Sequence, residues 1–421
     1  MSVGIGPLRD SRDFRLLWLA VLPAGLAMGA VGLAVFVQAF ELGGAAALGF
    51  LGLVQFVFLT LGALGGSAIV DHLDRRLLLV LTQAGFVVSV TALFVGSLLG
   101  DPPMALLYVT SAWGSSVASL HFPTRSAMIP PVVARAGLTT AMTLDMVVWN
   151  VTMILGPIAG GFVLARFGLS AVYGFGAAAH VIGLLTMLGL RRQPADKHRE
   201  DRLGFSAIRH GFAYLRPRPV LKGLLWIDLI AMAFGMRRAL FPILAVQQFG
   251  RGPEVVGLLM AAIPAGALAI SLTSGWLENV HRQGLGLVAG AAVWGVAVAV
   301  FGLTGANLWL GLLLLAVAGG ADIVAAILRA SIIQHEVPEF VRGRVWGINF
   351  LVLNGGPRLG DMTAGMSAAA WGATFSVVAG GLAALVGAGV FAVLVPELTR
   401  YTSADGIDPV DDGQTPLRGE T

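Results

Sequence analysis

The stretch GGSAIVDHLDRRLL, residues 65–78, joins two long apolar runs through a short and highly charged connection. Five of the six residues from Asp71 to Arg76 are ionisable, although only 12% of the 421 residues are charged and 57% are apolar. A soluble domain is about a quarter charged. Charge confined to brief gaps between apolar runs of about 20 residues indicates a polytopic membrane protein, because a helix of that length crosses a bilayer.

Twelve apolar runs of this kind follow one another along the chain. Their approximate limits are residues 14–39, 48–70, 77–99, 104–128, 138–165, 169–190, 220–247, 254–277, 284–304, 308–334, 343–368 and 372–395. Runs this long and continuous indicate helices rather than barrel strands, since a helix satisfies its own backbone hydrogen bonds in lipid. The sequence therefore predicts an all-α membrane protein with twelve transmembrane helices.

Lysine and arginine fall almost entirely on one side of this arrangement. With a cytoplasmic N-terminus, the opposite side holds only Arg166 and Arg251 outside the spans. Basic residues accumulate on the cytoplasmic side of membrane proteins, so both termini and the central connection are predicted to be cytoplasmic. We expect a multi-pass protein of a bacterial-type inner (cytoplasmic) membrane. The charged N-terminus has no short apolar core followed by a cleavage site, so a removed signal peptide is not expected.

The two halves of the chain resemble each other. At an offset of 208, LLWLAVL (Leu16–Leu22) aligns with LLWIDLI (Leu224–Ile230), and Arg125 and Arg329 precede similar segments further on. Repeats in preserved order predict two pseudo-symmetric six-helix bundles, a transporter architecture with the substrate site between them. The predicted parts are bundles at 1–192 and 220–400, a cytoplasmic linker with an amphipathic surface helix at 193–219, and a disordered tail at 401–421.

The charged connection resembles the loop 2–3 signature of the major facilitator superfamily, Gly-x-x-x-Asp-Arg-x-Gly-Arg-Arg. Asp71 matches the leading acid, and Arg75 and Arg76 match the final basic pair. The sequence departs from the signature in having Ser67, His72 and Asp74 at the first Gly, the first Arg and the internal Gly. An acid at the internal Gly is similar to the drug and siderophore exporter branch.

Other motifs are similar to the enterobactin exporter group within that branch. They are the N-terminal RDFRLLWLA, the mid-chain Gly156-Pro157-x-x-Gly160-Gly161, and RALFPILA followed by GLLMAAIPAGALAISLTSG. The resemblance covers nearly the whole chain. It implies the major facilitator fold, alternating access, and a substrate cavity lined by spans 1, 4, 7 and 10.

The resemblance also implies a conformational latch at Asp71, Asp74, Arg75 and Arg76. A carboxylate there can face the positive end of a helix from the other half, and the arginines can pair with acids. Such contacts stabilise the outward-facing state in the superfamily. The alternative is a short polar turn whose basic residues only set the topology.

Ionisable residues inside the spans are costly and usually face a cavity or a partner. The predicted substrate cavity contains Arg125, Arg237, Arg238, Arg329, Arg358 and His121. The carboxylates Asp322, Asp228 and Asp145 are the candidates for carrying a coupling proton.

Depth along spans 7 and 10 permits two acid–base pairs, Asp228–Arg329 and Asp322–Arg237, and static salt bridges are the alternative interpretation. His121 and His180 are more simply explained as hydrogen-bonded packing residues than as proton carriers.

Glycine–proline motifs lie inside spans 5 and 11. The first comprises Gly156, Pro157, Gly160 and Gly161, and the second comprises Gly356 and Pro357. By resemblance the span-5 motif is typical of exporters. The alternative is close helix packing without further meaning, because small residues let helices approach.

Several function classes lack their sequence signals. The chain has no cysteine, no Gly-x-x-x-x-Gly-Lys-Ser/Thr loop, and no His-Glu-x-x-His or Gly-x-Ser-x-Gly motif, so neither an enzyme nor a cofactor or metal is expected. Its basic residues lie in gaps between spans rather than on one surface, so no nucleic-acid partner is expected.

We expect a monomeric efflux transporter, an antiporter driven by protons, for siderophore-like or amphiphilic drug-like molecules. A multidrug antiporter of lipophilic cations is the alternative, although Arg237 and Arg238 argue against a cavity for cations alone. A channel and a non-transporting binding protein are the competing classes.

Overall fold

The computed structural model of the chain describes residues 5–70, 74–100, 102–192, 213–235 and 238–402. The long elements in these ranges are all helices. They are α1 (Gly6–Asp10), α2 (Arg12–Val70), α3 (Arg75–Leu98), α4 (Met104–Val132), α5 (Leu138–Leu188), α7 (Pro219–Phe234), α8 (Leu240–Gln247), α9 (Pro253–Leu272), α10 (Gln283–Gly302), α11 (Leu308–Glu336), α12 (Glu339–Trp371), α13 (Ala373–Leu394) and α14 (Pro396–Arg400). Asp71, Arg237, most of the predicted linker and the predicted tail lie outside the described residues.

Two of the helices cross the membrane twice. α2 is non-helical at Gly44 and α5 at Gly168, and the chain reverses at both positions. Seven helices in the described ranges, these two included, are long and apolar enough to span a membrane. The more polar α4 and α12, together with α7 followed by α8, supply three more crossings. Twelve crossings are therefore present in the described part of the chain, and the predicted fold class is confirmed.

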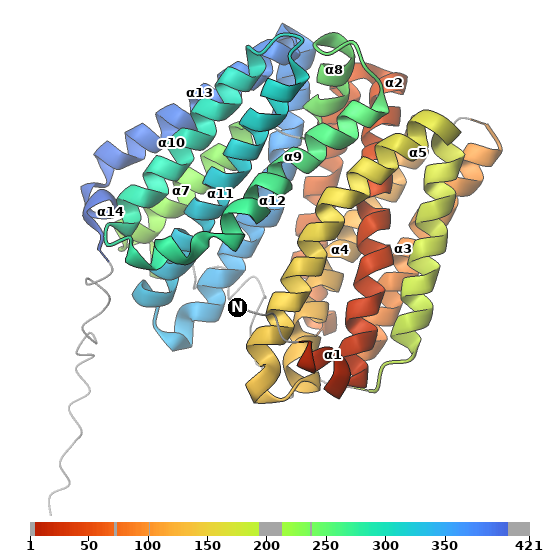
Figure 1. Cartoon of the computed structure of the whole chain (residues 1–421), viewed down its shortest axis with the longest axis horizontal. Helices are drawn as coiled ribbons and strands as arrows, with labels where there is room; N and C mark the ends of the chain where they lie inside the picture. The colour runs from red at the N-terminus through yellow and green to blue at the C-terminus, as the bar shows by residue number, and fades with distance from the viewer. Residues whose placement is uncertain (1–4, 71–73, 101, 193–212, 236–237, 403–421) are drawn as a thin grey trace, which may run out of the picture.

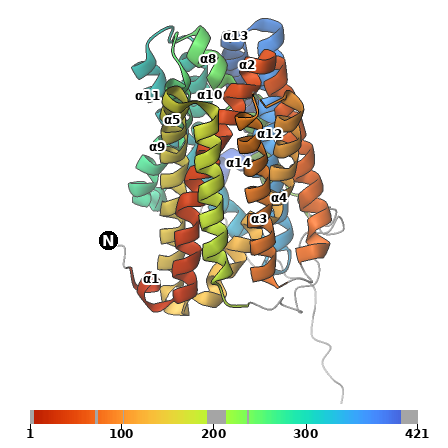
Figure 2. The same ribbon diagram turned by 90° about the vertical axis from the view of Figure 1, so that its right-hand side faces the viewer.

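The helices form two bundles that lie side by side (Figure 1). Helices α1 to α5 form the N-bundle, and α7 to α14 form the C-bundle. The view in Figure 2 looks onto the N-bundle, whose long helices run along the height of the molecule. We call the end that carries α1 and α14 the terminal end, and the end where α2 and α5 reverse the turn end.

Every described connection at the turn end contains a glycine with positive φ. The values are 65° at Gly44, 136° at Gly100, 76° at Gly168, 60° at Gly250, 58° at Gly305 and 88° at Gly372. Residues with a Cβ rarely adopt this left-handed conformation, whereas glycine reaches it without steric cost. The six reversals are therefore tight, and in α2 and α5 no loop separates the two spans.

The buried apolar residues show where the bundles meet. One cluster contains residues of both bundles, among them Leu51 and Leu240, and occupies the turn end. The described clusters nearer the terminal end each belong to one bundle, around Leu79 in the N-bundle and Leu224 in the C-bundle. The ribbons in Figure 1 accordingly converge at the turn end and diverge towards the terminal end.

Glycines shape the seam where the bundles touch, with α2 against α12 and α5 against α9. A Cβ on Gly49 would lie 3.0 Å from the backbone nitrogen of Met366, and a Cβ on Gly257 would collide with the carbonyl oxygen of Pro157. Gly49 and Gly257 are 208 residues apart, which is the offset of the sequence repeat. Each half therefore contributes an equivalent glycine that lets the opposite backbone approach closely.

The seventh span is broken, although the sequence predicted one continuous helix over 220–247. α7 ends at Phe234 and α8 begins at Leu240. Gly235 is extended, with ψ of −178°, and a Cβ there would overlap the ring of Trp294. Close packing against α10 thus accompanies the break, and hydropathy alone does not register it.

Candidate functional site

Side chains of α12 hold both ends of the broken span. The Thr363 hydroxyl donates a hydrogen bond to the carbonyl oxygen of Ala233 in the last turn of α7. Asp361, which is 4% exposed, accepts a hydrogen bond of 3.1 Å from the backbone N–H of Ala239 just before α8. These contacts satisfy backbone groups that the break removes from the helical ladder, which is required at membrane depth.

Positive charge gathers around this break. Arg238 lies in it with an exposed side chain, and Arg358 stands one turn before Asp361 on α12. The Arg358 guanidinium donates to the carbonyl oxygen of Asn354, while its Nε is buried without a hydrogen-bond partner in the described part of the chain. Both Arg238 and Asp361 lie within electrostatic range of that guanidinium. Arg238 and Arg358, which were both predicted to line the substrate cavity, are thus close together.

Asp228 and Arg329 form a buried ion pair between α7 and α11. They are 8% and 5% exposed. This is the first of the two pairs predicted from depth along the spans. Asp322 of the second pair has an exposed side chain on α11, and its predicted partner Arg237 lies outside the described residues.

Arg125 and Asp145 form a second ion pair, between α4 and α5 in the N-bundle. Two guanidinium nitrogens of Arg125 donate to the two carboxylate oxygens of Asp145, in a fork that matches carboxylate geometry. Arg125 is only 8% exposed. The sequence singled out both residues but did not pair them.

His121 and His180 lie inside the N-bundle with polar partners from α3. Nδ1 of His121 is 2.9 Å from the Thr82 hydroxyl, and Nδ1 of His180 is 3.2 Å from the side-chain nitrogen of Gln83. The ring of Phe86 contacts both imidazoles, with centroid distances of 5.4 Å. Both histidines are therefore hydrogen-bonded and packed.

The described latch residues make contacts within their own bundle. Asp74 caps α3 by accepting hydrogen bonds from the backbone N–H groups of Arg76 and Leu77 at 2.8 and 3.3 Å. The guanidinium groups of Arg75 and Arg76 donate to carbonyl oxygens of α4 and α5 at 3.1 and 2.6 Å. Asp71, the leading acid of the signature, lies outside the described residues.

The glycine–proline motifs lie at helix contacts. A Cβ on Gly156 or Gly160 would crowd the backbone of α2, and a Cβ on Gly161 would clash with the carbonyl oxygen of Pro253 on α9. A Cβ on Gly356 would crowd the side chain of Met232 on α7. The prolines that follow Gly156 and Gly356 lie inside α5 and α12. The span-5 motif thus contacts both its own bundle and the opposite one.

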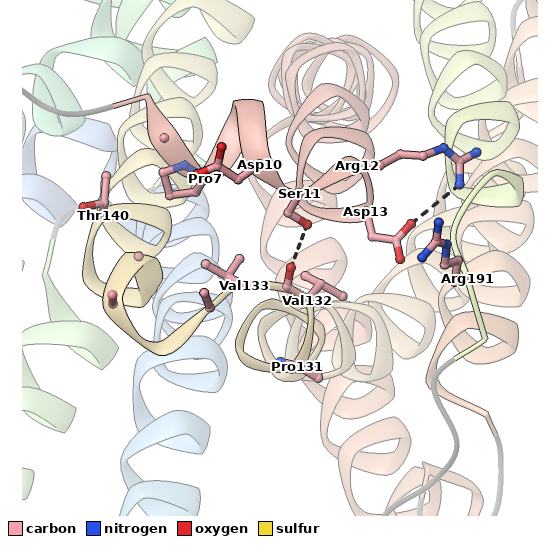
Figure 3. A pocket seen from close by; sticks show the side chains of 14 residues that line it. Pro7, Asp10, Ser11, Arg12, Asp13, Pro131, Val132, Val133, Thr140 and Arg191 are labelled. Carbon is pink, nitrogen blue, oxygen red and sulfur yellow. Dashed lines mark hydrogen bonds and ion pairs between the residues drawn. The ribbon is translucent and has the colours of Figure 1, made fainter.

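A surface pocket of about 790 Å³ lies at the terminal end of the N-bundle, between α1, the start of α2 and the α4–α5 connection (Figure 3). The Ser11 hydroxyl donates to the carbonyl oxygen of Val132 at 2.6 Å and accepts from the backbone N–H of Phe14 at 3.1 Å. Arg12 lies 3.8 Å from the carboxylate of Asp13. The pocket is lined by one bundle, so it is separate from the charged residues at the broken span.

Residues 2–414 match the family model described as transmembrane secretion effector, which belongs to the major facilitator superfamily. The enterobactin exporter EntS of Citrobacter koseri is 28% identical over 416 residues, which are 96% of this chain and 96% of that protein. EntS of Shigella boydii serotype 18 is 30% identical over 351 residues, or 81% and 82% of the two chains.

Solved transporter structures share the fold. The crystal structure of a D-xylose–proton symporter superposes with a TM-score of 0.71 at 15% sequence identity, covering 93% of this chain and 100% of that one. This similarity confirms the major facilitator fold, and the family is one of transporters rather than enzymes. The chain is a multi-pass membrane protein that belongs to the transmembrane secretion effector family of the major facilitator superfamily.

Proposed function

We propose that this transporter exports siderophore-like or amphiphilic drug-like molecules, driven by the proton gradient. The observation that carries the proposal is the similarity to enterobactin exporters along 96% of both chains. The similarity supports export as the direction of transport, and the charged residues of the site support the substrate class.

The charges around the broken span support an anionic or oxygen-rich substrate. Arg238 is exposed, and the Nε of the neighbouring Arg358 has no hydrogen-bond partner among the described residues. A guanidinium at membrane depth is costly without an acid, water or anionic ligand beside it. Catecholate and carboxylate groups offer pairs of oxygens that match its fork.

Alternating access supplies the mechanism. If the terminal end is cytoplasmic, as the placement of basic residues predicts, the bundles meet on the outer side and the conformation is inward-facing. Rocking would then separate α2 from α12 and α5 from α9 while the terminal ends approach. The intra-bundle contacts of Arg75 and Arg76 fit a disengaged latch in this state.

Three carboxylates remain the proposed proton carriers. Asp145 and Asp228 each bind a buried arginine, and the side chain of Asp322 on α11 is exposed. A solvent-exposed carboxylate exchanges protons with water more readily than a buried one. We therefore place Asp322 first, with Asp228 and Asp145 next.

Transport into inverted membrane vesicles tests the proposal. An imposed gradient with an acidic interior should drive uptake of a labelled catecholate siderophore, and dissipating the gradient should stop it. Faster uptake of a lipophilic cation than of the siderophore would favour the general multidrug antiporter. Vesicles that bind both compounds without accumulating either would indicate a binding protein and contradict the proposal.

A further inference from the structure

A small, half-open pocket of about 30 Å³ lies among the helices of the N-bundle, apart from the surface pocket and from the broken span. Side chains from α2, α3, α4 and α5 surround it. The residues that matter are Ala20, Gln83, Phe86, His121, Arg125 and His180. Four of these carry polar groups, and all four are at least nine-tenths buried.

The cavity lies where the two halves differ. Ala20 occupies the position in LLWLAVL that Asp228 occupies in LLWIDLI, and Arg125 corresponds to Arg329. In the C-bundle the carboxylate of Asp228 binds Arg329. In the N-bundle a methyl group stands at that position, so the space beside Arg125 is left for another group.

Two polar atoms at the cavity have no partner in the described part of the chain. Arg125 uses two guanidinium nitrogens on Asp145, and its Nε remains as a buried donor. Gln83 donates to the carbonyl oxygen and to Nδ1 of His180 at 2.9 and 3.2 Å, and its Oε1 remains as a buried acceptor. Leaving such buried atoms unpaired destabilises the folded protein.

The hydrogen-bond network assigns the histidine tautomers. The Thr82 hydroxyl lies 2.9 and 3.0 Å from the carbonyl oxygens of Leu78 and Leu79. With its single proton directed to either carbonyl, Thr82 accepts from Nδ1–H of His121. That leaves Nε2 of His121 as an acceptor. Nδ1 of His180 accepts from Gln83, so its Nε2 carries the proton and is a donor.

We propose that the cavity is an internal water site that takes the place of the missing carboxylate beside Arg125. A water molecule needs about 10–15 Å³ of such space, so the 30 Å³ beside these polar groups holds one or two waters. The two donors, Arg125 Nε–H and His180 Nε2–H, and the two acceptors, Gln83 Oε1 and His121 Nε2, match the two lone pairs and two protons of water. The water completes the hydrogen bonding of Arg125 and fixes its guanidinium for Asp145.

A pair of substitutions at Ala20 distinguishes a water site from a dry void. Ala20→Ser brings a hydroxyl that can replace a water, whereas Ala20→Val brings only methyl groups. If water is bound, Val should lower the apparent melting temperature in detergent by about 2 °C or more relative to Ser. A dry void predicts the reverse order, since filling it with methyl groups stabilises and a buried hydroxyl does not. Val equal to or better than Ser would overturn the proposal.

The same pair at Ala27, which is fully buried and does not line the cavity, is the matched control. At Ala27, the Ser variant should not have a higher apparent melting temperature than the Val variant. The wild-type protein supplies a second measurement that needs no stable variant. With ¹⁵N-labelled histidine, NMR should show the Nδ1–H tautomer for His121 and the Nε2–H tautomer for His180, assigned with His121→Gln and His180→Gln. The opposite tautomers would remove the donor–acceptor match with water.

Discussion

Arg125 and Arg329 stand at corresponding places on α4 and α11, yet their carboxylate partners come from different helices. Arg329 binds Asp228 of α7, the first span of its bundle, whereas Arg125 binds Asp145 of α5, the span that follows it. The pseudo-symmetry of the sequence therefore extends to the two buried arginines but not to their counter-ions. Each bundle neutralises its buried arginine with a carboxylate, but the two carboxylates come from helices that do not correspond to each other.

Removing either carboxylate should destabilise the protein strongly. We expect Asp145→Ala and Asp228→Ala each to lower the free energy of unfolding by about 3–5 kcal/mol, because a buried guanidinium is left uncompensated. Thermal unfolding of the purified variants measures the loss. The double changes Arg125→Met with Asp145→Leu, and Arg329→Met with Asp228→Leu, should cost much less. Equal losses in single and double variants would contradict the ion-pair explanation.

The difference between the bundles permits a rescue. Ala20→Asp places a carboxylate beside Arg125 at the position that Asp228 holds in the other half. Added to Asp145→Ala, it should recover most of the lost stability, because Arg125 again has a counter-ion. Ala20→Asn in the same background is the control, since it adds similar volume without charge. If Ala20→Asn restored stability as well as Ala20→Asp, the loss in Asp145→Ala would not be due to the missing negative charge.

The glycine seam should control the conformation. Gly49→Val and Gly257→Val place branched side chains against the opposite backbone, so the bundles should separate at the turn end, at a cost of about 1–3 kcal/mol. The chain has no cysteine, so paired cysteines can be introduced for spin-label distances between α2 and α12. Gly32→Val is the matched control, because nothing lies within 4 Å of a Cβ there. Unchanged distances in the Gly49 and Gly257 variants would argue against the seam as a determinant of the state.

Coupling should depend on Asp322. We expect Asp322→Asn to reach the membrane and bind substrate, and to lose uptake driven by an imposed pH gradient in inverted vesicles, because the amide cannot carry the proton. Asp322→Glu should retain part of the activity. Normal gradient-driven uptake by the Asn variant would transfer the role to Asp228 or Asp145.

Substrate charge should be sensed by Arg238. Arg238→Gln is expected to weaken binding of an anionic siderophore by about 1.5–3 kcal/mol, the range for a hydrogen bond to a charged group, while a lipophilic cation binds no worse. Titration calorimetry with both compounds gives the comparison. Arg238→Lys separates charge from the guanidinium fork, and equal losses for anion and cation would mark Arg238 as structural.

Topology is tested by reporter fusions. Fusions after Pro194 and after Gly406 should report a cytoplasmic location, and a fusion at Gly252 an external one, because nearly all basic residues outside the spans lie on one side. A cytoplasmic signal at Gly252 would contradict the assignment of the terminal end to the cytoplasm.

The fold was predictable because hydrophobic length is a strong signal. The twelve runs and the repeat at an offset of 208 indicated the crossings and the two halves, and the charged connection around Arg75 indicated the superfamily. A hydropathy average over the seventh span did not show its break, because the segments before Gly235 and after Arg238 are both strongly apolar. That break accompanies contacts with Trp294 of α10 and with Thr363 of α12, which are distant in the sequence.

The site was predictable in its residue types and less so in its pairings. Depth along the helices gave the contact between Asp228 and Arg329. The pair of Arg125 with Asp145 depends on how α4 and α5 rotate about their axes, and no spacing across the intervening connection shows that rotation. The capping by Asp74 had a local signal, since an acid immediately before a helix commonly accepts its first N–H groups. Orphan atoms such as Gln83 Oε1 are defined only by the packed structure.

The six left-handed glycines at the turn end also determine how accessible that face is to antibody fragments, proteases and inserted tags. With reversals this tight, that face presents little more than helix ends, so it offers few side chains to an antibody fragment and no slack for a protease or an inserted epitope tag. Reagents that lock the transporter from this side would need to wedge between helix ends, as a small rigid loop can. Affinity tags and fusion partners are better carried by the opposite face, where the described helices begin with α1 and end with α14.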